Sequence, residues 1–153
     1  MGSTFSVSGP KGDAGTPGVD GTDGVDGQDA PTIYLPLTYT IDNDTSAITT
    51  GDKQGLVIPF SGSIIGWTAL SWGGISGSIV IDIWKDTYAN FPPTVADSIC
   101  ASALPTISSS TKGQSFVLTG WSPTITAGDI PKFNVVSCTD IKRVTLTLWV
   151  QLT

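Results

Sequence analysis

Glycine recurs at every third position from residue 9 to residue 27 of this 153-residue chain. The seven consecutive triplets begin at Gly9, Gly12, Gly15, Gly18, Gly21, Gly24 and Gly27. A strict period of three is the signature of the collagen triple helix, because only glycine fits at the crowded axis where three chains meet. A flexible glycine-rich linker would not keep that period. The repeat therefore predicts a collagen-like stem over residues 9–29 and a homotrimer of parallel chains.

The predicted stem is short and poor in proline. Only Pro10 and Pro17 occupy the variable positions of its triplets. The last four triplets each end in an aspartate: Asp20, Asp23, Asp26 and Asp29. Three associated chains would bring these like charges together, which disfavours the triple helix. We therefore expect the rest of the chain to stabilise the trimer and to set the register of the stem.

After about residue 30 the chain changes to short apolar stretches separated by turn residues. The clearest stretch is the last, in which apolar and mostly polar residues alternate from Val144 to Leu152 with the period of two that is typical of a β-strand. Further strands are expected over 33–39, 56–60, 63–70, 78–84, 115–118 and 133–136. Many short strands predict an all-β fold, here a jelly-roll-like β-sandwich head that is homotrimeric and follows a short triple-helical stem.

The expected organisation has four parts. Residues 1–8 form an N-terminal tail whose first residues resemble a cloning remnant and which lacks the basic start and apolar core of a secretory signal. Residues 9–29 form the stem, residues 30–55 a connector with the first strands, and residues 56–153 the β-sandwich head.

Charge and composition exclude several classes of function. All 13 acidic residues are aspartates, against seven Lys and Arg, and the net charge is −6. Binding to nucleic acid needs a basic face that neutralises phosphates, so we expect no nucleic-acid partner. The apolar stretches are as short as strands, so we expect no insertion into a membrane.

The residues suited to catalysis are few. The chain has no histidine, which excludes histidine-based general-base catalysis, triads and metal ligands. Cys100 and Cys138 belong to no CxxC pair, and they are either small core residues or one disulfide. Asp82 and Asp86 could act as a glycosidase pair, but an aspartate beside an apolar strand is more often a solvated residue or a turn cap. We expect no enzymatic activity, no cofactor and no metal site.

Two aromatic segments, residues 81–99 and 66–74, carry candidate receptor contacts. Aromatic faces stack on the apolar faces of sugars, and nearby polar groups can bind sugar hydroxyls. The candidate residues are Trp72, Asp86, Tyr88, Asn90 and Phe91. In the alternative interpretation Trp67 and Trp84 are core residues, and Tyr88 and Phe91 pin their loop. We expect the receptor site on loops at the end of the head away from the stem and on its flanks, foremost on residues 85–93.

Residues 84–99 (WKDTYANFPPTVADSI) resemble a segment of the C-terminal heads of tail-fibre proteins from tailed bacteriophages and prophages. Residues 58–67 (IPFSGSIIGW), 127–130 (AGDI) and 143–148 (RVTLTL) are similar to other parts of those heads. The resemblance covers residues 56–152, and it implies a trimeric fibre tip on the virion, extracellular during adsorption, that binds a bacterial surface glycan or protein. It assigns no receptor-binding residue.

A second hypothesis belongs to another class of protein. A structural collagen-like surface or spore-coat filament protein with a trimeric jelly-roll head would have the same stem and head. A third hypothesis, a depolymerising tailspike, would need a much longer body with a carbohydrate groove.

Overall fold

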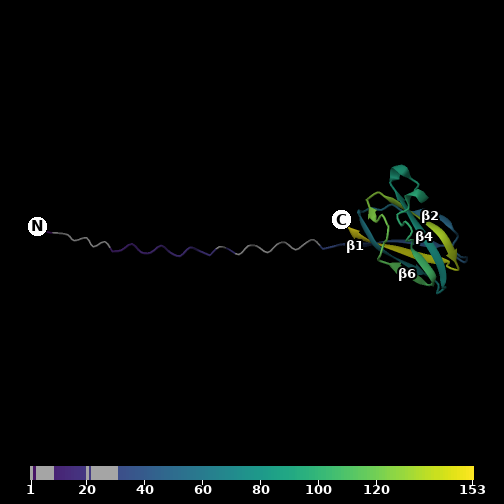
Figure 1. The fold of residues 1–153 in the computed structure, drawn as a ribbon, viewed down its shortest axis with the longest axis horizontal. Coiled ribbons are helices and arrows are strands. Elements are labelled where there is room, and N and C mark those ends of the chain that lie inside the picture. The colour runs from purple at the N-terminus through teal and green to yellow at the C-terminus, as the bar shows by residue number, and fades with distance from the viewer. Residues whose placement is uncertain (1, 3–8, 20, 22–30) are drawn as a thin grey trace. The chain divides into compact units, whose positions relative to one another are not determined.

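The computed structural model describes residue 2, residues 9–19, residue 21 and residues 31–153 (Figure 1). The chain divides into two compact units, Met1–Ala30 and Pro31–Thr153, and we call the second unit the head. In the first unit, residues 9–19 and 21 are exposed and have no regular secondary structure. The rest of the predicted stem, including Gly24 and Gly27, lies outside the described residues, as does the predicted tail except for Gly2.

The head is built from β-strands, as predicted. These strands are β1 (Tyr34–Asp42), β2 (Gly51–Gly55), β3 (Gly62–Ser71), β4 (Gly77–Asp86), β5 (Thr106–Ser110), β6 (Lys112–Ser115), β7 (Thr124–Ile125), β8 (Ile130–Thr139) and β9 (Arg143–Leu152). Within the described residues the helical segments are two 3-10 turns, η1 (Tyr88–Asn90) and η2 (Val95–Asp97). The first sheet has the order β1-β9-β3-β6, with β7 also paired to β3, and the second sheet has the order β2-β8-β4-β5. All the pairings are antiparallel.

The core is made by alternate residues of the long strands. In β9, Val144, Leu146, Leu148 and Val150 are almost wholly buried, whereas the residues between them are partly exposed. The second sheet contributes the isoleucines of β4 and Phe133 of β8, whose ring stacks on Tyr39 with 4.5 Å between the ring centroids. The period of two in the sequence therefore predicted β9 and its buried side chains correctly.

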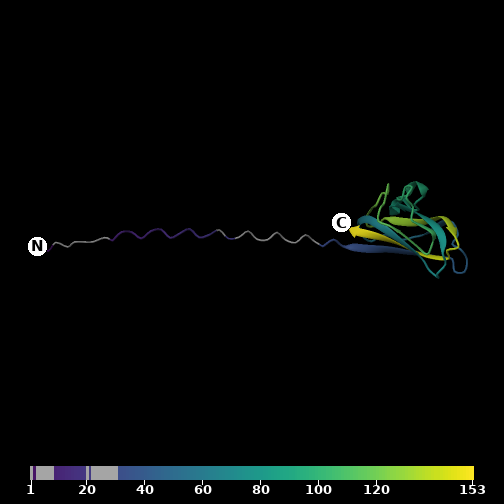
Figure 2. The ribbon, with the colours of Figure 1, turned by 60° about the horizontal axis from the view of Figure 1, so that its bottom comes forward.

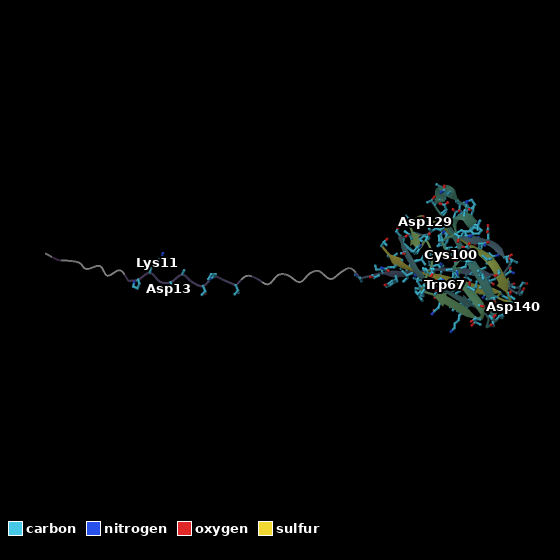
Figure 3. The ribbon with its side chains drawn as sticks, viewed as in Figure 1. Lys11, Asp13, Trp67, Cys100, Asp129 and Asp140 are labelled. Carbon is cyan, nitrogen blue, oxygen red and sulfur yellow. The ribbon has the colours of Figure 1, made fainter. Side chains whose placement is uncertain are left out.

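The head has two ends, which its strand pairing defines. Tyr34 at the start of β1 lies opposite Gln151, and the C-terminus lies beside β1 (Figures 1 and 2). We call this the N-terminal end of the head. Asp42 pairs with Arg143 at the other end, the far end. Figure 3 labels Asp129 toward the first of these ends and Asp140 toward the second.

Two predicted strands are wrong. Residues 56–60 belong to no strand. Ile58 bonds instead to the turn before β8, donating its N–H to the Asp129 carbonyl and accepting from the Gly128 N–H. Of residues 115–118 only Ser115 is in a strand, as the last residue of β6. The Ser115 hydroxyl bonds to both the N–H and the carbonyl of Val117, and residues 116–118 belong to no strand. Strands β5 and β6 lie, apart from Ser115, in sequence for which no strand was expected.

The structure also bears on what was expected of residues 30–55 and of the two cysteines. The segment that the sequence assigned to a connector and first strands, residues 30–55, supplies β1 to the first sheet and β2 to the second. Cys100 is buried and Cys138 is partly buried, and both are free, so the core interpretation of the cysteines is correct. Burial raises the pKa of both thiols.

No helix in the described part of the chain has the length and apolarity needed to cross a bilayer.

Gly66 permits an aromatic side chain to lie against the first sheet. Gly66 pairs with Trp149 of β9, just after a register shift in β3. A Cβ atom at this position would overlap the ring of Phe116, which lies on the glycine. The backbone angles at Gly66 do not themselves require glycine, and the three atoms nearest to such a Cβ all belong to the Phe116 ring.

We expect Gly66→Ala to destabilise the head by roughly 1–3 kcal/mol, because the added methyl group forces the Phe116 ring to move. Denaturant unfolding of the full chain measures this change. In a Phe116→Ala background the ring is gone, so the same substitution should cost less than about 1 kcal/mol. An equal cost in both backgrounds would show that something other than the ring excludes a side chain.

Candidate functional site

The segment between β4 and the return of the chain at Ser98 holds three of the five predicted receptor contacts, and a fourth, Asp86, is the last residue of β4. We call residues 87–98 the receptor loop after these predicted contacts, and its two 3-10 turns project from the head in Figure 1. It begins where β4 ends, and it returns at Ser98, which forms an isolated antiparallel bridge with Trp84. Both ends of the loop are therefore fixed to the same strand.

Asp86 shapes the first turn. Its Oδ1 atom accepts hydrogen bonds from the Thr87 N–H at 2.7 Å and from the Asn90 side-chain amide at 3.1 Å. These two bonds hold the pKa of the Asp86 carboxyl below its ordinary value, so they support the turn at neutral pH and are lost only as the pH falls through that lowered value. The polar groups of Asp86 and Asn90 thus hold each other in place.

Asp82 fixes the return of the loop. The buried carboxylate accepts from the Ser98 hydroxyl at 2.6 Å, from the Trp84 indole N–H at 2.7 Å and from the Ile83 N–H at 2.8 Å. Each of the two oxygens has a donor, as a buried charge requires. This aspartate is a structural anchor of the loop.

An ion pair anchors the start of the loop. Lys85, two residues before the loop, places its Nζ atom 2.8 Å from the carboxylate of Asp129, and that carboxylate also accepts from the Thr126 N–H. Both side chains of the ion pair are largely buried, with 19% and 7% of their surfaces exposed. Lys132 adds a third tie, because it donates to the Pro93 carbonyl at 3.3 Å.

The loop exposes large apolar side chains on this anchored backbone. Tyr88 is 82% exposed, Val95 70% and Phe91 61%. Tyr88 and Phe91 therefore do not pin the loop, which its polar groups hold instead. Trp67 is buried in the core, as the alternative interpretation expected. Trp84 is also buried, but it lies outside the core cluster, with the Lys132 ammonium group 5.1 Å from the centre of its ring. Val95 was not among the predicted contacts, because nothing in the sequence distinguishes it from a core valine.

Trp72 lies elsewhere. It follows β3, whose last residue pairs with Val144 at the far end, and its indole N–H donates to the Thr145 hydroxyl at 2.8 Å. The receptor loop follows Asp86, which pairs with Ile130 near the N-terminal end. Trp72 therefore lies at the far end of the head, whereas the loop begins near its N-terminal end. The two sets of candidates form separate surfaces.

A third surface was missed by the sequence analysis. Tyr34, Ile65, Phe116 and Trp149 line a hollow of about 360 Å³ on the outward face of the first sheet. We call these four residues the apolar patch. The sequence contained one signal of this surface. Thr145, Thr147 and Trp149 are alternate residues of β9 on the same face, so the tryptophan is a large aromatic side chain among small polar ones.

The two carboxylates considered for glycoside hydrolysis have structural roles. Asp86 supports a turn, as the sequence analysis favoured, whereas Asp82 is buried and bonded to three donors. The described residues contain no group of three or more metal-ligating side chains in positions that could hold an ion.

No protein-family model and no curated protein sequence matches this chain.

We expect Asp82→Ala to lower the free energy of unfolding by roughly 2–4 kcal/mol, because the indole N–H of Trp84 and the Ser98 hydroxyl lose a buried acceptor. The Ile99 N–H, which donates to the Ile83 carbonyl, should exchange with solvent faster as the loop loosens. Asp82→Asn keeps one acceptor oxygen and should give a smaller loss. Unchanged exchange at Ile99 in the alanine variant would contradict an anchoring role.

Proposed function

We propose that this protein is the trimeric tip of a bacteriophage or prophage tail fibre, and that it binds a receptor on the bacterial surface. The observation that carries the proposal is the run of seven Gly-X-Y triplets joined directly to an all-β head. A collagen repeat has a structural purpose only when three chains associate. The fibre assignment then follows the resemblance of residues 56–152 to tail-fibre heads.

The glycines of the repeat support association of three chains. A Cβ atom at Gly9, Gly12, Gly15, Gly18 or Gly21 would meet nothing within 4 Å in the single chain. Crowding within one chain therefore does not account for a glycine at every third position. Crowding at the axis of a triple helix does.

The strand order supports a jelly-roll head. Apart from the two-residue β7, the head has eight strands in two sheets, ordered β1-β9-β3-β6 and β2-β8-β4-β5. Most successive strands cross from one sheet to the other, as in a double-sheet jelly roll. A compact head of this kind suits the role of a fibre tip, because loops at its ends and flanks are free to vary without changing the core.

The exposed side chains of the receptor loop support binding rather than catalysis. Tyr88 and Phe91 offer aromatic faces for the apolar faces of sugars, and the anchored backbone lowers the entropy that is lost on binding. A single contact of this kind is weak, but three copies on one trimer act together through their effective concentration. The proposed receptor is accordingly a repeating surface glycan, and the proposed activity is adhesion without cleavage.

We expect sedimentation of the full chain at micromolar concentration to give three times the 15.8 kDa chain mass. The stem is short and acidic, so a chain without residues 1–30 should remain a folded trimer. A peptide of residues 9–29 should show no triple-helical circular dichroism near room temperature. A monomeric full chain would contradict the proposal.

Labelling of candidate host cells with the fluorescent full chain, competed by extracted surface polysaccharide, tests receptor binding. Tyr88→Ala removes roughly 1 kcal/mol of ring contact per copy, so a trimer should lose roughly a hundredfold in avidity while its melting is unchanged. Trp72→Ala is the matched aromatic control at the far end.

A loss of labelling in Trp72→Ala alone would move the receptor site to the far end. A trimer that labels no cells in any candidate host would contradict adhesion and favour the surface-filament hypothesis. New reducing ends in the bound polysaccharide would contradict adhesion without cleavage.

A further inference from the structure

The apolar patch combines residues from four segments on one outward face. Tyr34 begins β1, Ile65 lies in β3, Trp149 in β9, and Phe116 follows β6. Tyr34 and Phe116 expose more than half of their surfaces, 54% and 56%. Large apolar side chains gathered around one hollow on a soluble protein are typical of a surface that another molecule covers.

We propose that the apolar patch is the surface through which three copies of this chain associate, with the first sheet turned toward their common axis. The inference rests on the proposed trimer and identifies the interface within it. Four residues lie between Asp29, the last residue of the repeat, and Tyr34. The five Cα–Cα steps from Asp29 to Tyr34 span about 18 Å at most, so chains that leave one triple helix begin β1 close to the same axis.

The charges on this face fit association around a threefold axis. A residue near such an axis meets its own copies, so a charged residue there would meet like charges. The four strands β1, β9, β3 and β6 contain three charged residues, Asp42, Arg143 and Lys112. All three lie toward the far end, and Asp42 and Arg143 form an ion pair with each other. The part of the face around the patch is uncharged.

The polar groups on the face are largely paired within the chain. The hydroxyls of Thr38 and Thr147 lie 3.1 Å apart, and the Trp149 indole N–H donates to the Thr68 hydroxyl at 3.0 Å. Hydroxyls that already have partners lose less when water is removed, so this surface can be buried at low cost. The apolar patch then supplies the favourable free energy.

The outward face of the second sheet is charged, unlike the face around the apolar patch. Lys132 forms an ion pair with Asp52 at 2.6 Å and lies 5.1 Å from the centre of the Trp84 ring. The receptor loop is tied to this face through the Pro93 carbonyl. A face that is charged and carries the chain's own loop is a poor interface between identical copies. It faces outward in the proposed trimer, where the receptor loop is accessible.

The test is Phe116→Asp in the full chain. Three introduced carboxylates would meet near the axis, so sedimentation at micromolar concentration should change from three chain masses to one. Val95→Asp introduces the same charge at an exposed aliphatic residue of the receptor loop and should leave the trimer intact. Both variants should retain the circular dichroism of a folded β-protein.

The outcomes separate this inference from the trimer itself. A monomeric unmodified chain refutes both the proposed trimer and the proposed interface. A trimeric unmodified chain together with a folded, trimeric Phe116→Asp variant refutes only the assignment of the patch. If Phe116→Asp does not fold, hydroxyl-radical footprinting of the unmodified trimer tests whether the apolar patch is buried between the chains. Oxidation of Phe116 and Trp149 as slow as that of buried Phe133 supports the interface, and oxidation as fast as that of Tyr88 overturns it.

Discussion

The alternation of side chains along β9 is the constraint on which the rest of the head depends. β9 is hydrogen-bonded on both edges, to β1 and to β3, and four of its side chains fill the core. A shift of one residue would move those four side chains into water at a cost of about 1.5–3 kcal/mol each. The same alternation directs Thr145, Thr147 and Trp149 outward. One strand thereby determines both the core and the character of the outward face.

Buried carboxylates provide the second constraint, and they act on the receptor loop. Asp82 and Asp129 are the buried charged residues of the described chain, and each is bonded to groups at one end of the loop. Loss of one partner would leave an uncompensated charge in the interior, which is far more costly than loss of an exposed ion pair. The exposed rings of Tyr88 and Phe91 therefore project from a base that the chain's own contacts fix.

The sequence predicted the features that depend on local pattern. The long alternating strands were found with small errors at their ends, and Asp86, Tyr88, Asn90 and Phe91 were predicted together because they lie in one continuous segment. It could not show that Trp72 and that segment lie toward opposite ends of the head, since their positions depend on the pairing of β3 and β4. Nor could it reveal that the register shift near Ile65 turns this side chain outward while Ile64 and Trp67 stay in the core.

A sandwich with two unlike outward faces has a consequence for a fibre tip. If the uncharged face of the first sheet is turned toward a threefold axis, the charged face of the second sheet and its loop must point away from it. The three receptor loops of such a trimer then lie on its periphery, too far apart for one small ligand to contact them together. A polymer with a repeating unit can reach all three, and its binding gains from their effective concentration. The proposed interface thus favours a repeating glycan as the receptor over a monovalent one.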